Sequence, residues 1–218
     1  GAATGTLLFN SIRGGAAAYY FKDVIGNQAI FSCGIYLAVG EIANMIGVAA
    51  AVPFADRLGK KTAFITALLS AAILSLFIAF LPVSEPSWLW VLLLLQIIIS
   101  LAAGITLPLL WSMFADIADY SAYRNSSAST GLIFSSSSMS QKFGGAFGSA
   151  LILWVFAGFG YDTSEGAVQS ATAIDGLKAM MSWIPALGAI AAAGILALYP
   201  LTSKRMQEIS ASLRNKTA

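Results

Sequence analysis

The sequence has no histidine, a single cysteine, Cys33, and few charged residues. Only 10% of its 218 residues are Asp, Glu, Lys or Arg, whereas soluble domains average about 25%. Because histidine is the commonest general base and metal ligand, its absence weakens metalloenzyme and histidine-dependent hydrolase interpretations. One cysteine excludes a disulfide scaffold, and a net charge of +2 gives no nucleic-acid-binding signature.

Long apolar stretches are what the sequence contains instead, and 58% of its residues are hydrophobic. A helix needs about 20 apolar residues to cross roughly 30 Å of hydrocarbon. Three stretches of that length carry no charge, and three carry one charge each, Arg13, Glu41 or Lys142. Membrane strands would alternate apolar and polar residues, which these stretches do not. We therefore predict an all-α membrane protein with six transmembrane helices, at about residues 1–21, 30–55, 62–82, 88–114, 129–159 and 177–200, and a cytoplasmic tail at 201–218.

Lys and Arg residues are shared unevenly between the two sides on which the connections would lie. Eight fall in segments 56–61, 115–128 and 201–218, and only two fall in the connections of the other side. The positive-inside rule then predicts a cytoplasmic C-terminus, and six spans put the N-terminus on the same side. The chain starts without an initiator Met or a positively charged flank. We therefore expect the chain to be part of a longer polypeptide rather than to begin with a signal peptide.

Lys142 lies near the middle of an apolar stretch, where an ammonium group is costly and indicates a functional site by default. At 100° per residue, one helical face carries Lys142 with several small and hydroxylated residues: Ser135, Ser138, Gly145 and Ser149, with Ser137 and Gln141 alongside. This face is a suitable lining for a polyhydroxylated or anionic ligand. For the serines alone, close packing of transmembrane helices is an equally simple explanation.

Arg13 and Glu41 are the two other charges inside predicted spans. A polar cavity is the default explanation for such groups. For Arg13 two structural alternatives stay open, because its long side chain can reach an interface or pair with Glu41.

Two connecting segments carry charged residues that can pair. Asp56 and Arg57 precede a glycine and two lysines, and this segment is also explained by positive-inside anchoring alone. Asp116 and Asp119 are three residues apart and share a helical face. Because carboxylates near a helix C-terminus meet an unfavourable dipole, we expect a cationic partner, Arg57 or Arg124. Such a network is either a latch for one conformation of a moving protein or a static surface ion pair.

Several motifs in this order resemble the second half of the glycoside-pentoside-hexuronide:cation symporters, whose best-known member is the melibiose carrier. The motifs are Arg13 with Tyr19-Tyr20-Phe21, then Gly59-Lys60-Lys61, then Ala115-Asp116-Ile117-Ala118-Asp119-Tyr120 with Tyr123-Arg124, and Lys142-Phe143-Gly144. The resemblance covers essentially the whole chain. It implies the C-terminal six-helix bundle, helices seven to twelve, of a twelve-helix major facilitator fold.

The resemblance also implies roles for individual residues. Lys142 stands where the family has a lysine near its sugar and cation sites, and Ser137, Ser138 and Gln141 match positions that line the pocket. Leu107 stands where the melibiose carrier has an aromatic residue, so Trp111, one turn later, is the candidate stacking platform. The cytoplasmic gating network of the family is matched by Asp116, Asp119 and Arg124.

We therefore expect secondary active transport of a sugar or sugar derivative, coupled to Na+ or H+ by alternating access. An anionic sugar is a further possibility, suggested by Lys142 and Arg13. No enzymatic activity, cofactor or resident metal is expected, and the coupling cation, Na+, Li+ or H+, would bind mainly to a first half outside this sequence. The implied partners are the sugar, the cation, that N-terminal half and the lipid of a bacterial inner membrane. The alternative is a membrane-embedded interaction module without transport of its own.

Overall fold

The computed structural model describes residues 1–26, 29–83, 85–125, 130–164 and 166–201, together with five residues of the tail, 205, 206, 208, 209 and 212. Regular structure in these residues is helical throughout, which confirms the predicted all-α fold. In chain order the elements are α1 (Ala2–Tyr19), the π-helix η1 (Tyr20–Ile25), α2 (Cys33–Leu58), α3 (Lys60–Ile78), α4 (Ser87–Asn125), α5 (Thr130–Phe159), α6 (Ala171–Met181) and α7 (Trp183–Ala197).

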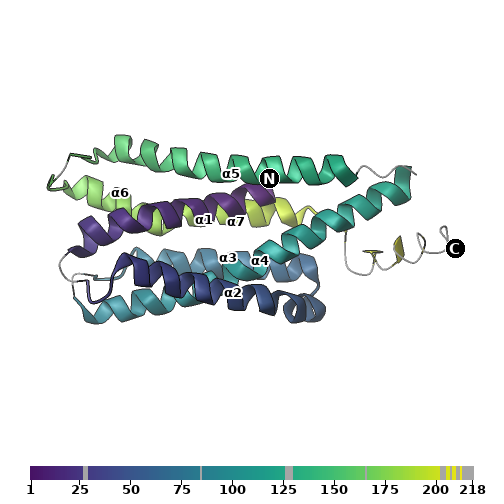
Figure 1. Cartoon of the computed structure of the whole chain (residues 1–218), viewed down its shortest axis with the longest axis horizontal. Helices are drawn as coiled ribbons and strands as arrows, with labels where there is room; N and C mark the ends of the chain where they lie inside the picture. The colour runs from purple at the N-terminus through teal and green to yellow at the C-terminus, as the bar shows by residue number, and fades with distance from the viewer. Residues whose placement is uncertain are drawn as a thin grey trace.

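Within the described residues, five helical segments are long and apolar enough to cross a membrane. They are Cys33–Leu58, Lys60–Ile78, Ser87–Arg124, Thr130–Phe159 and Ala171–Ala197. The first predicted span forms α1, which is not among the five because it carries several polar residues, Asn10 and Arg13 among them. It nevertheless runs alongside the others in the bundle (Figure 1).

Two boundaries differ from those expected. Helix α4 continues to Asn125, so Asp116, Asp119 and Arg124 lie on a helix and not in a connecting loop. The last predicted span begins earlier, at Ala171, and is divided at Ser182, whose φ of −125° and ψ of −93° separate α6 from α7. Pro185 explains the division, because it has no N–H to donate to the carbonyl of residue 181.

The helices form three tiers in Figure 1, with α5 along the top, α1 with α6 and α7 in the middle, and α2, α3 and α4 below. Helix α1 packs against α5 and α7, α4 packs against α2 and α3, and α3 also contacts α7. Much of the core is alanine, which lets the helix backbones approach closely. The α2–α3 connection and the end of α4 lie at one end of the bundle, and the end of α5 lies at the other (Figure 1).

Helices α1 and α5 are held together by glycines and, at one end, by a polar bond. A Cβ at Gly144 would overlap the Thr4 carbonyl oxygen, and a Cβ at Gly148 would lie 2.8 Å from the Ser11 Cβ. At the end where α5 stops, the Tyr161 hydroxyl donates to Asp23 Oδ2 of η1 at 2.5 Å. These contacts fix the position of α1, which carries Arg13.

Candidate functional site

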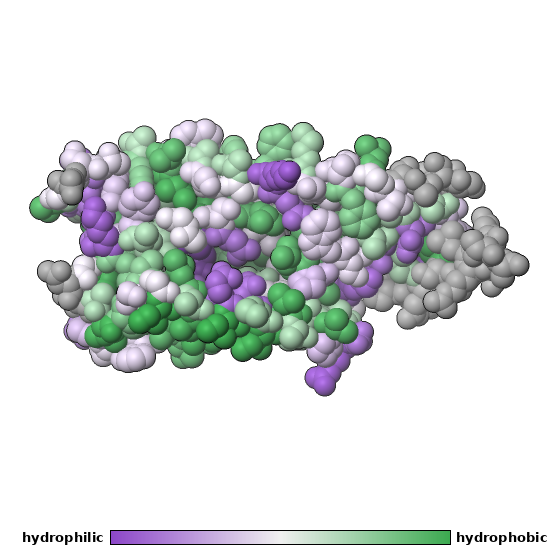
Figure 2. All heavy atoms as spheres, viewed as in Figure 1, coloured by the Kyte–Doolittle hydropathy of each residue, from purple (hydrophilic) through white to green (hydrophobic). Residues whose placement is uncertain are grey.

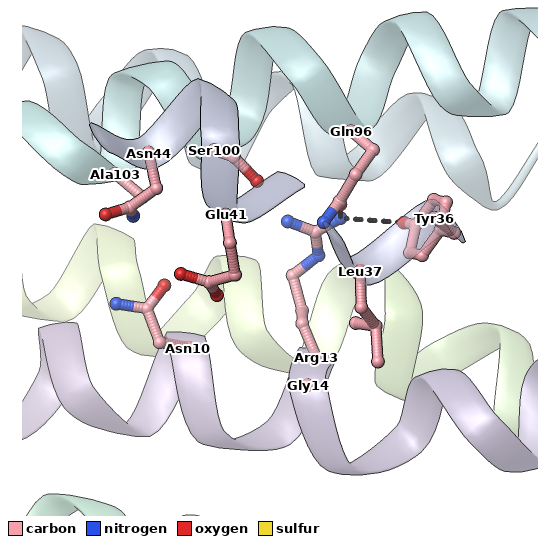
Figure 3. Close-up of a pocket in the computed structure, with 10 residues that line it drawn as sticks. All are labelled: Asn10, Arg13, Gly14, Tyr36, Leu37, Glu41, Asn44, Gln96, Ser100 and Ala103. Carbon is pink, nitrogen blue, oxygen red and sulfur yellow. Dashed lines mark hydrogen bonds between the residues drawn. The ribbon is translucent and has the colours of Figure 1, made fainter. Parts of the chain in front are cut away.

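A polar cavity of about 200 Å³ lies between α1, α2 and α4 (Figure 3). Its lining includes one guanidinium, one carboxylate, three amides and two hydroxyls among ten residues: Asn10, Arg13, Gly14, Tyr36, Leu37, Glu41, Asn44, Gln96, Ser100 and Ala103. Figure 2 shows hydrophilic side chains gathered across the middle of the drawn face, between more hydrophobic surfaces. Within an apolar bundle, such a concentration of polar groups indicates a place for a polar ligand.

Arg13 is the most deeply placed charge of the cavity, and only 8% of its surface is exposed. Its Nη2 donates to Gln96 Oε1 at 2.8 Å and to the Tyr36 hydroxyl at 3.4 Å. The guanidinium also lies 5.6 Å from the centre of the Phe9 ring, at cation–π distance. Its Nε is buried and has no hydrogen-bond partner.

Glu41 lines the same cavity but does not pair with Arg13. None of the described carboxylates forms an ion pair with Arg13, so the structure does not show the Arg13–Glu41 pairing that was one of the two structural alternatives. The guanidinium donates instead to two neutral acceptors on neighbouring helices. Glu41 itself is exposed at the cavity wall.

Glycines set the walls of the cavity. Where α2 crosses α4, a Cβ at Gly47 would overlap the Leu101 carbonyl, and a Cβ at Gly104 would overlap the Asn44 carbonyl. This contact brings the two backbones together beside the polar groups of both helices. One further glycine, Gly40, leaves the space that the Gln96 amide occupies. The cavity therefore depends on backbone contacts that only glycine permits.

The predicted face of α5 is arranged differently. Lys142 is exposed, and the structure shows no bond from it to a described residue. The nearby hydroxyls return to their own helix, as Ser137 does in donating to the Ile133 carbonyl at 2.7 Å. Gln141 has a buried Nε2 without a partner. Of the six residues predicted to bind substrate, only Arg13 lines the cavity; Lys142, Ser137, Ser138, Gln141 and Trp111 do not.

Trp111 instead connects α4 with α5. Its ring stacks on Phe134 of α5, with centroids 6.0 Å apart and planes at 13°. It also meets Phe114 edge to face. One face of the indole is therefore occupied by protein, while 39% of the residue stays exposed.

The predicted charged network is present in part at the end of the bundle where α3 begins. Asp116 accepts from Lys60 at 2.7 and 2.9 Å, so its partner is Lys60 and not Arg57 or Arg124 as predicted. Gly59 makes this possible, because its φ of +80° turns the chain sharply between α2 and α3 and starts α3 at Lys60.

The remaining predicted gating residues are not joined to that pair. Arg124 donates to the Tyr120 hydroxyl of its own helix at 3.4 Å. Asp56, Arg57 and Asp119 are exposed and form no ion pair within the described part of the chain.

Two contacts that the sequence analysis missed extend this charged cluster to α7. Lys61 donates to the carbonyls of Ala197 and Tyr199 at 2.7 and 2.8 Å, which places a cation at the end of a helix. The Tyr199 hydroxyl donates to the Met113 carbonyl at 3.4 Å, and burial together with the nearby Asp116 carboxylate raises the pKa of Tyr199. The first residues of α3 thus tie α4 and the end of α7 together.

The sequence analysis also missed most of the cavity lining. Asn10, Tyr36, Asn44, Gln96 and Ser100 are neutral, and neutral polar residues give a weak signal in an apolar helix. Their spacing was the available clue, because Gln96 and Ser100 are four residues apart and so lie on one face of α4.

A protein-family model and three curated relatives match nearly the whole chain. The protein-family model described as MFS/sugar transport protein matches residues 3–203. Three proteins of Escherichia coli (strain K12) are similar to the chain. The Inner membrane symporter YicJ is 32% identical over 203 residues, covering 93% of the chain and 43% of that protein. The Putative glycoside/cation symporter YagG is 29% identical over 204 residues, 94% of the chain and 43% of that protein. The Glucuronide carrier protein homolog is 27% identical over 206 residues, 92% of the chain and 43% of that protein.

The chain therefore spans less than half the length of these curated relatives, whose names describe transporters and not enzymes. The family match covers nearly all of the chain, and five of its helical segments can cross a membrane. The chain belongs to the MFS/sugar transport protein family, among the glycoside-pentoside-hexuronide:cation symporters of the major facilitator superfamily, and is a multi-pass membrane protein.

Proposed function

We propose that this chain forms the C-terminal half of a cation-coupled carrier for a sugar or sugar derivative. The observation that carries the proposal is the polar cavity between α1, α2 and α4, in a chain of a sugar-transport family. Amides, hydroxyls and a carboxylate are the groups that bind sugar hydroxyls, because each hydroxyl both donates and accepts a hydrogen bond. The cavity supplies all three.

The size of the cavity fits one wall of a larger site. Ligand pockets usually occupy about 300–1,000 Å³, whereas this cavity measures about 200 Å³. The cavity is therefore smaller than a typical complete ligand site. We propose that residues outside this chain, in the other half of the polypeptide, complete the site and provide most of the ligands for Na+, Li+ or H+.

Transport would follow from alternating access in a bacterial inner membrane, with the C-terminus in the cytoplasm. The Lys60–Asp116 pair and the Lys61 contacts with α7 hold the cytoplasmic end of this half together in the present arrangement. If sugar and cation each favour the state that binds the other, an inward cation gradient concentrates the sugar. The exposed Lys142, with Ser137, Ser138 and Gln141 beside it, would then face the substrate path from α5.

Uptake measurements test the proposal directly. The gene product that contains this chain is reconstituted in vesicles, and accumulation of labelled glycosides, pentosides and hexuronides is followed with and without an inward sodium or proton gradient. We expect gradient-dependent accumulation of at least one sugar. Absence of accumulation for all sugars and both gradients would contradict transport and favour a membrane-embedded interaction module.

A single substitution on α5 tests whether Lys142 contributes to sugar binding, independently of whether the protein is a carrier. Lys142→Ala is expected to lower sugar affinity and uptake. Unchanged uptake and affinity would remove Lys142 from the substrate path while leaving the carrier function in place.

A further inference from the structure

The π-helix η1 (Tyr20–Ile25) continues α1 beyond Arg13, toward the end of the bundle where α5 stops. In a π-helix each backbone N–H bonds to a carbonyl one residue further back than in an α-helix, and such segments are rare and frequently mark functional sites. We infer that η1 is a hinge coupled to the cavity through Tyr36, and that a ligand in the cavity releases the contact between η1 and the end of α5. The inference goes beyond the proposed function and rests on it only for the nature of the ligand, a sugar.

Tyr36 of α2 belongs both to the cavity and to the surroundings of η1. Its hydroxyl accepts from Arg13 Nη2 at 3.4 Å at the edge of the cavity (Figure 3). A bond of this length is weak, so a ligand that bonds to the guanidinium or to the hydroxyl competes with it. The Tyr36 ring also lies 5.1 Å from the ring of Phe21 in η1, with the planes at 50°. Both side chains are buried, so a shift of Tyr36 displaces Phe21, because a close-packed interior leaves no space to absorb it.

The same π-helix is anchored to the end of α5. Asp23 of η1 accepts from the Tyr161 hydroxyl at 2.5 Å, just beyond the last residue of α5. The Tyr161 ring stacks on Phe156 at a centroid distance of 4.2 Å, and Tyr19, the residue before η1, meets both rings edge to face. The cavity and this contact are therefore connected through Tyr36 and the short backbone of η1.

The π-helix gives the hinge two discrete arrangements. If the N–H groups of η1 return to α-helical pairing, its side chains rotate about the helix axis, by about 100° for a change of one residue in register. Asp23 then points away from Tyr161, and their bond is released. The Tyr20 hydroxyl is fully buried in the present register and lacks a hydrogen-bond partner among the described residues. Because an unsatisfied buried hydroxyl is unfavourable, the π register is weakened, and a ligand that favours the other register shifts the balance between them.

Spin labels beside the Asp23–Tyr161 bond test this coupling without any sugar. Lys22 and Asp162 are exposed neighbours of the bonded pair. Both are replaced by cysteine and labelled in the complete gene product in nanodiscs, with its other cysteines, Cys33 among them, changed to serine. Dipolar broadening then measures how close the two labels lie. We expect Tyr36→Phe to reduce the broadening, because the ring is kept but the bond that holds it in place is lost.

Tyr199→Phe is the matched control for this variant. It also deletes one hydroxyl and one hydrogen bond of 3.4 Å, but at the opposite end of the bundle. It should leave the broadening unchanged. If Tyr36→Phe does not fold, Phe21→Leu interrupts the same connection from the side of η1 and should reduce the broadening in its place.

Sugars extend the test to the ligand. Methyl β-D-glucoside, methyl β-D-galactoside and methyl β-D-glucuronide are added separately, and each one that binds by calorimetry should reduce the broadening in the labelled protein but not in its Tyr36→Phe variant. Linkage requires the reverse effect as well, so a variant that weakens the contact should bind the same sugar more tightly. We expect about threefold tighter binding in Tyr161→Phe, although this residue lies outside the cavity, and no change in Tyr19→Phe, which keeps the bonded pair.

The outcomes separate the hinge from the carrier. Unchanged broadening in both Tyr36→Phe and Phe21→Leu, or an equal change in Tyr199→Phe, would overturn the coupling of η1 to the cavity. Sugar binding without any change at the labels would overturn the hinge and leave the carrier function standing. If no sugar binds or accumulates, the proposed function fails, while the comparison of Tyr36→Phe with Tyr199→Phe still decides whether η1 responds to Tyr36.

Discussion

Arg13 and Lys142 are both cations within long apolar helices, but their surroundings differ completely. Arg13 is buried between three helices and donates to side chains of α2 and α4. Lys142 is exposed on α5, and the serines around it bond to their own helix backbone, as Ser137 and Ser149 do. The comparison shows that a polar group contributes to a site when its bonds cross from one helix to another. Pairs of similar residues, one with such cross-helix contacts and one without, allow this distinction to be tested.

The largest effect is expected at the glycine contact that supports the cavity. Gly104→Ala places a methyl group on the backbone of α2 at Asn44, which has no flexible end to move aside. We expect the variant to lose more than about 3 kcal/mol of stability or to fail to fold. Thermal unfolding of the detergent-solubilised protein, followed by tryptophan fluorescence, measures the loss.

Gly158→Ala on α5 is the control for this substitution. A Cβ at Gly158 meets nothing within 4 Å, so the variant should be unchanged or stabilised by about 0.5–1 kcal/mol through helix propensity. Equal losses in the two variants would mean that the α2–α4 contact does not support the cavity.

The second-largest loss of stability is expected at Gln96, and Gln141 is the glutamine with which it is compared. Gln96→Leu removes the 2.8 Å acceptor of the buried Arg13 guanidinium and should cost about 2 kcal/mol. Gln141→Leu removes an amide whose buried Nε2 has no partner, so the change should be neutral or slightly stabilising. The midpoints of thermal unfolding give both values. A loss in Gln141→Leu as large as that in Gln96→Leu would show that the Gln141 side chain also makes a cross-helix polar contact.

The third-largest loss of stability is expected at Asp116, and Asp119 is the other α4 carboxylate with which it is compared. The Asp116 side chain is 13% exposed and that of its partner Lys60 is 37% exposed, so solvent weakens their attraction. We expect Asp116→Asn to cost about 1 kcal/mol and Asp119→Asn less than about 0.5 kcal/mol. Unfolding at low and high salt measures both variants, and the loss in Asp116→Asn should shrink as salt increases.

A charge exchange tests whether the Lys60–Asp116 bond itself is responsible. The double variant Lys60→Asp with Asp116→Lys restores the attraction, so it should recover part of the stability lost in Asp116→Asn. If the double variant is less stable than Lys60→Asp alone and Asp116→Lys alone, the pair does not act as an isolated ion pair.

The fold was largely predictable because helices that cross the hydrocarbon of a membrane need long uncharged stretches, and these are easily recognised in a sequence. The errors occurred where helices extend into polar sequence. Helix α4 passes Asp116 because Lys60 neutralises that carboxylate, and this partner comes from another element. Helix α6 begins at Ala171 because the Ser170 hydroxyl accepts from the Ala173 N–H at 3.2 Å, a cap that the sequence signalled only weakly.

The site was less predictable, for physical reasons that particular residues illustrate. Arg13 was identifiable because a charge within an apolar helix is rare. Its partners Tyr36 and Gln96 were not, since they depend on which helices cross, and that crossing is set by Gly47 and Gly104. The assignment of Lys142 stays a prediction, because its side chain is exposed and bonds to none of the described residues.

The smallest effect concerns the polar bond at the other end of α1. The Tyr161 hydroxyl bonds to Asp23 across two elements, whereas Tyr19 meets the Tyr161 ring only edge to face. Burial, and then the bond to and charge of Asp23, raise the pKa of Tyr161 above its ordinary value. At neutral pH, Tyr161→Phe should therefore cost about 1 kcal/mol, and Tyr19→Phe should cost less.

The pH dependence of this difference follows from the direction of the shift. A pKa raised in the folded state stabilises the protein fully below the ordinary tyrosine pKa of about 10 and loses that stabilisation as the pH rises above it. Unfolding midpoints of the wild type and Tyr161→Phe should therefore differ equally at pH 7 and 9, and the difference should become smaller at pH 11. A difference that stays constant to pH 11 would contradict a contribution from the neutral hydroxyl, because the ring that stacks on Phe156 at a centroid distance of 4.2 Å is retained in Tyr161→Phe.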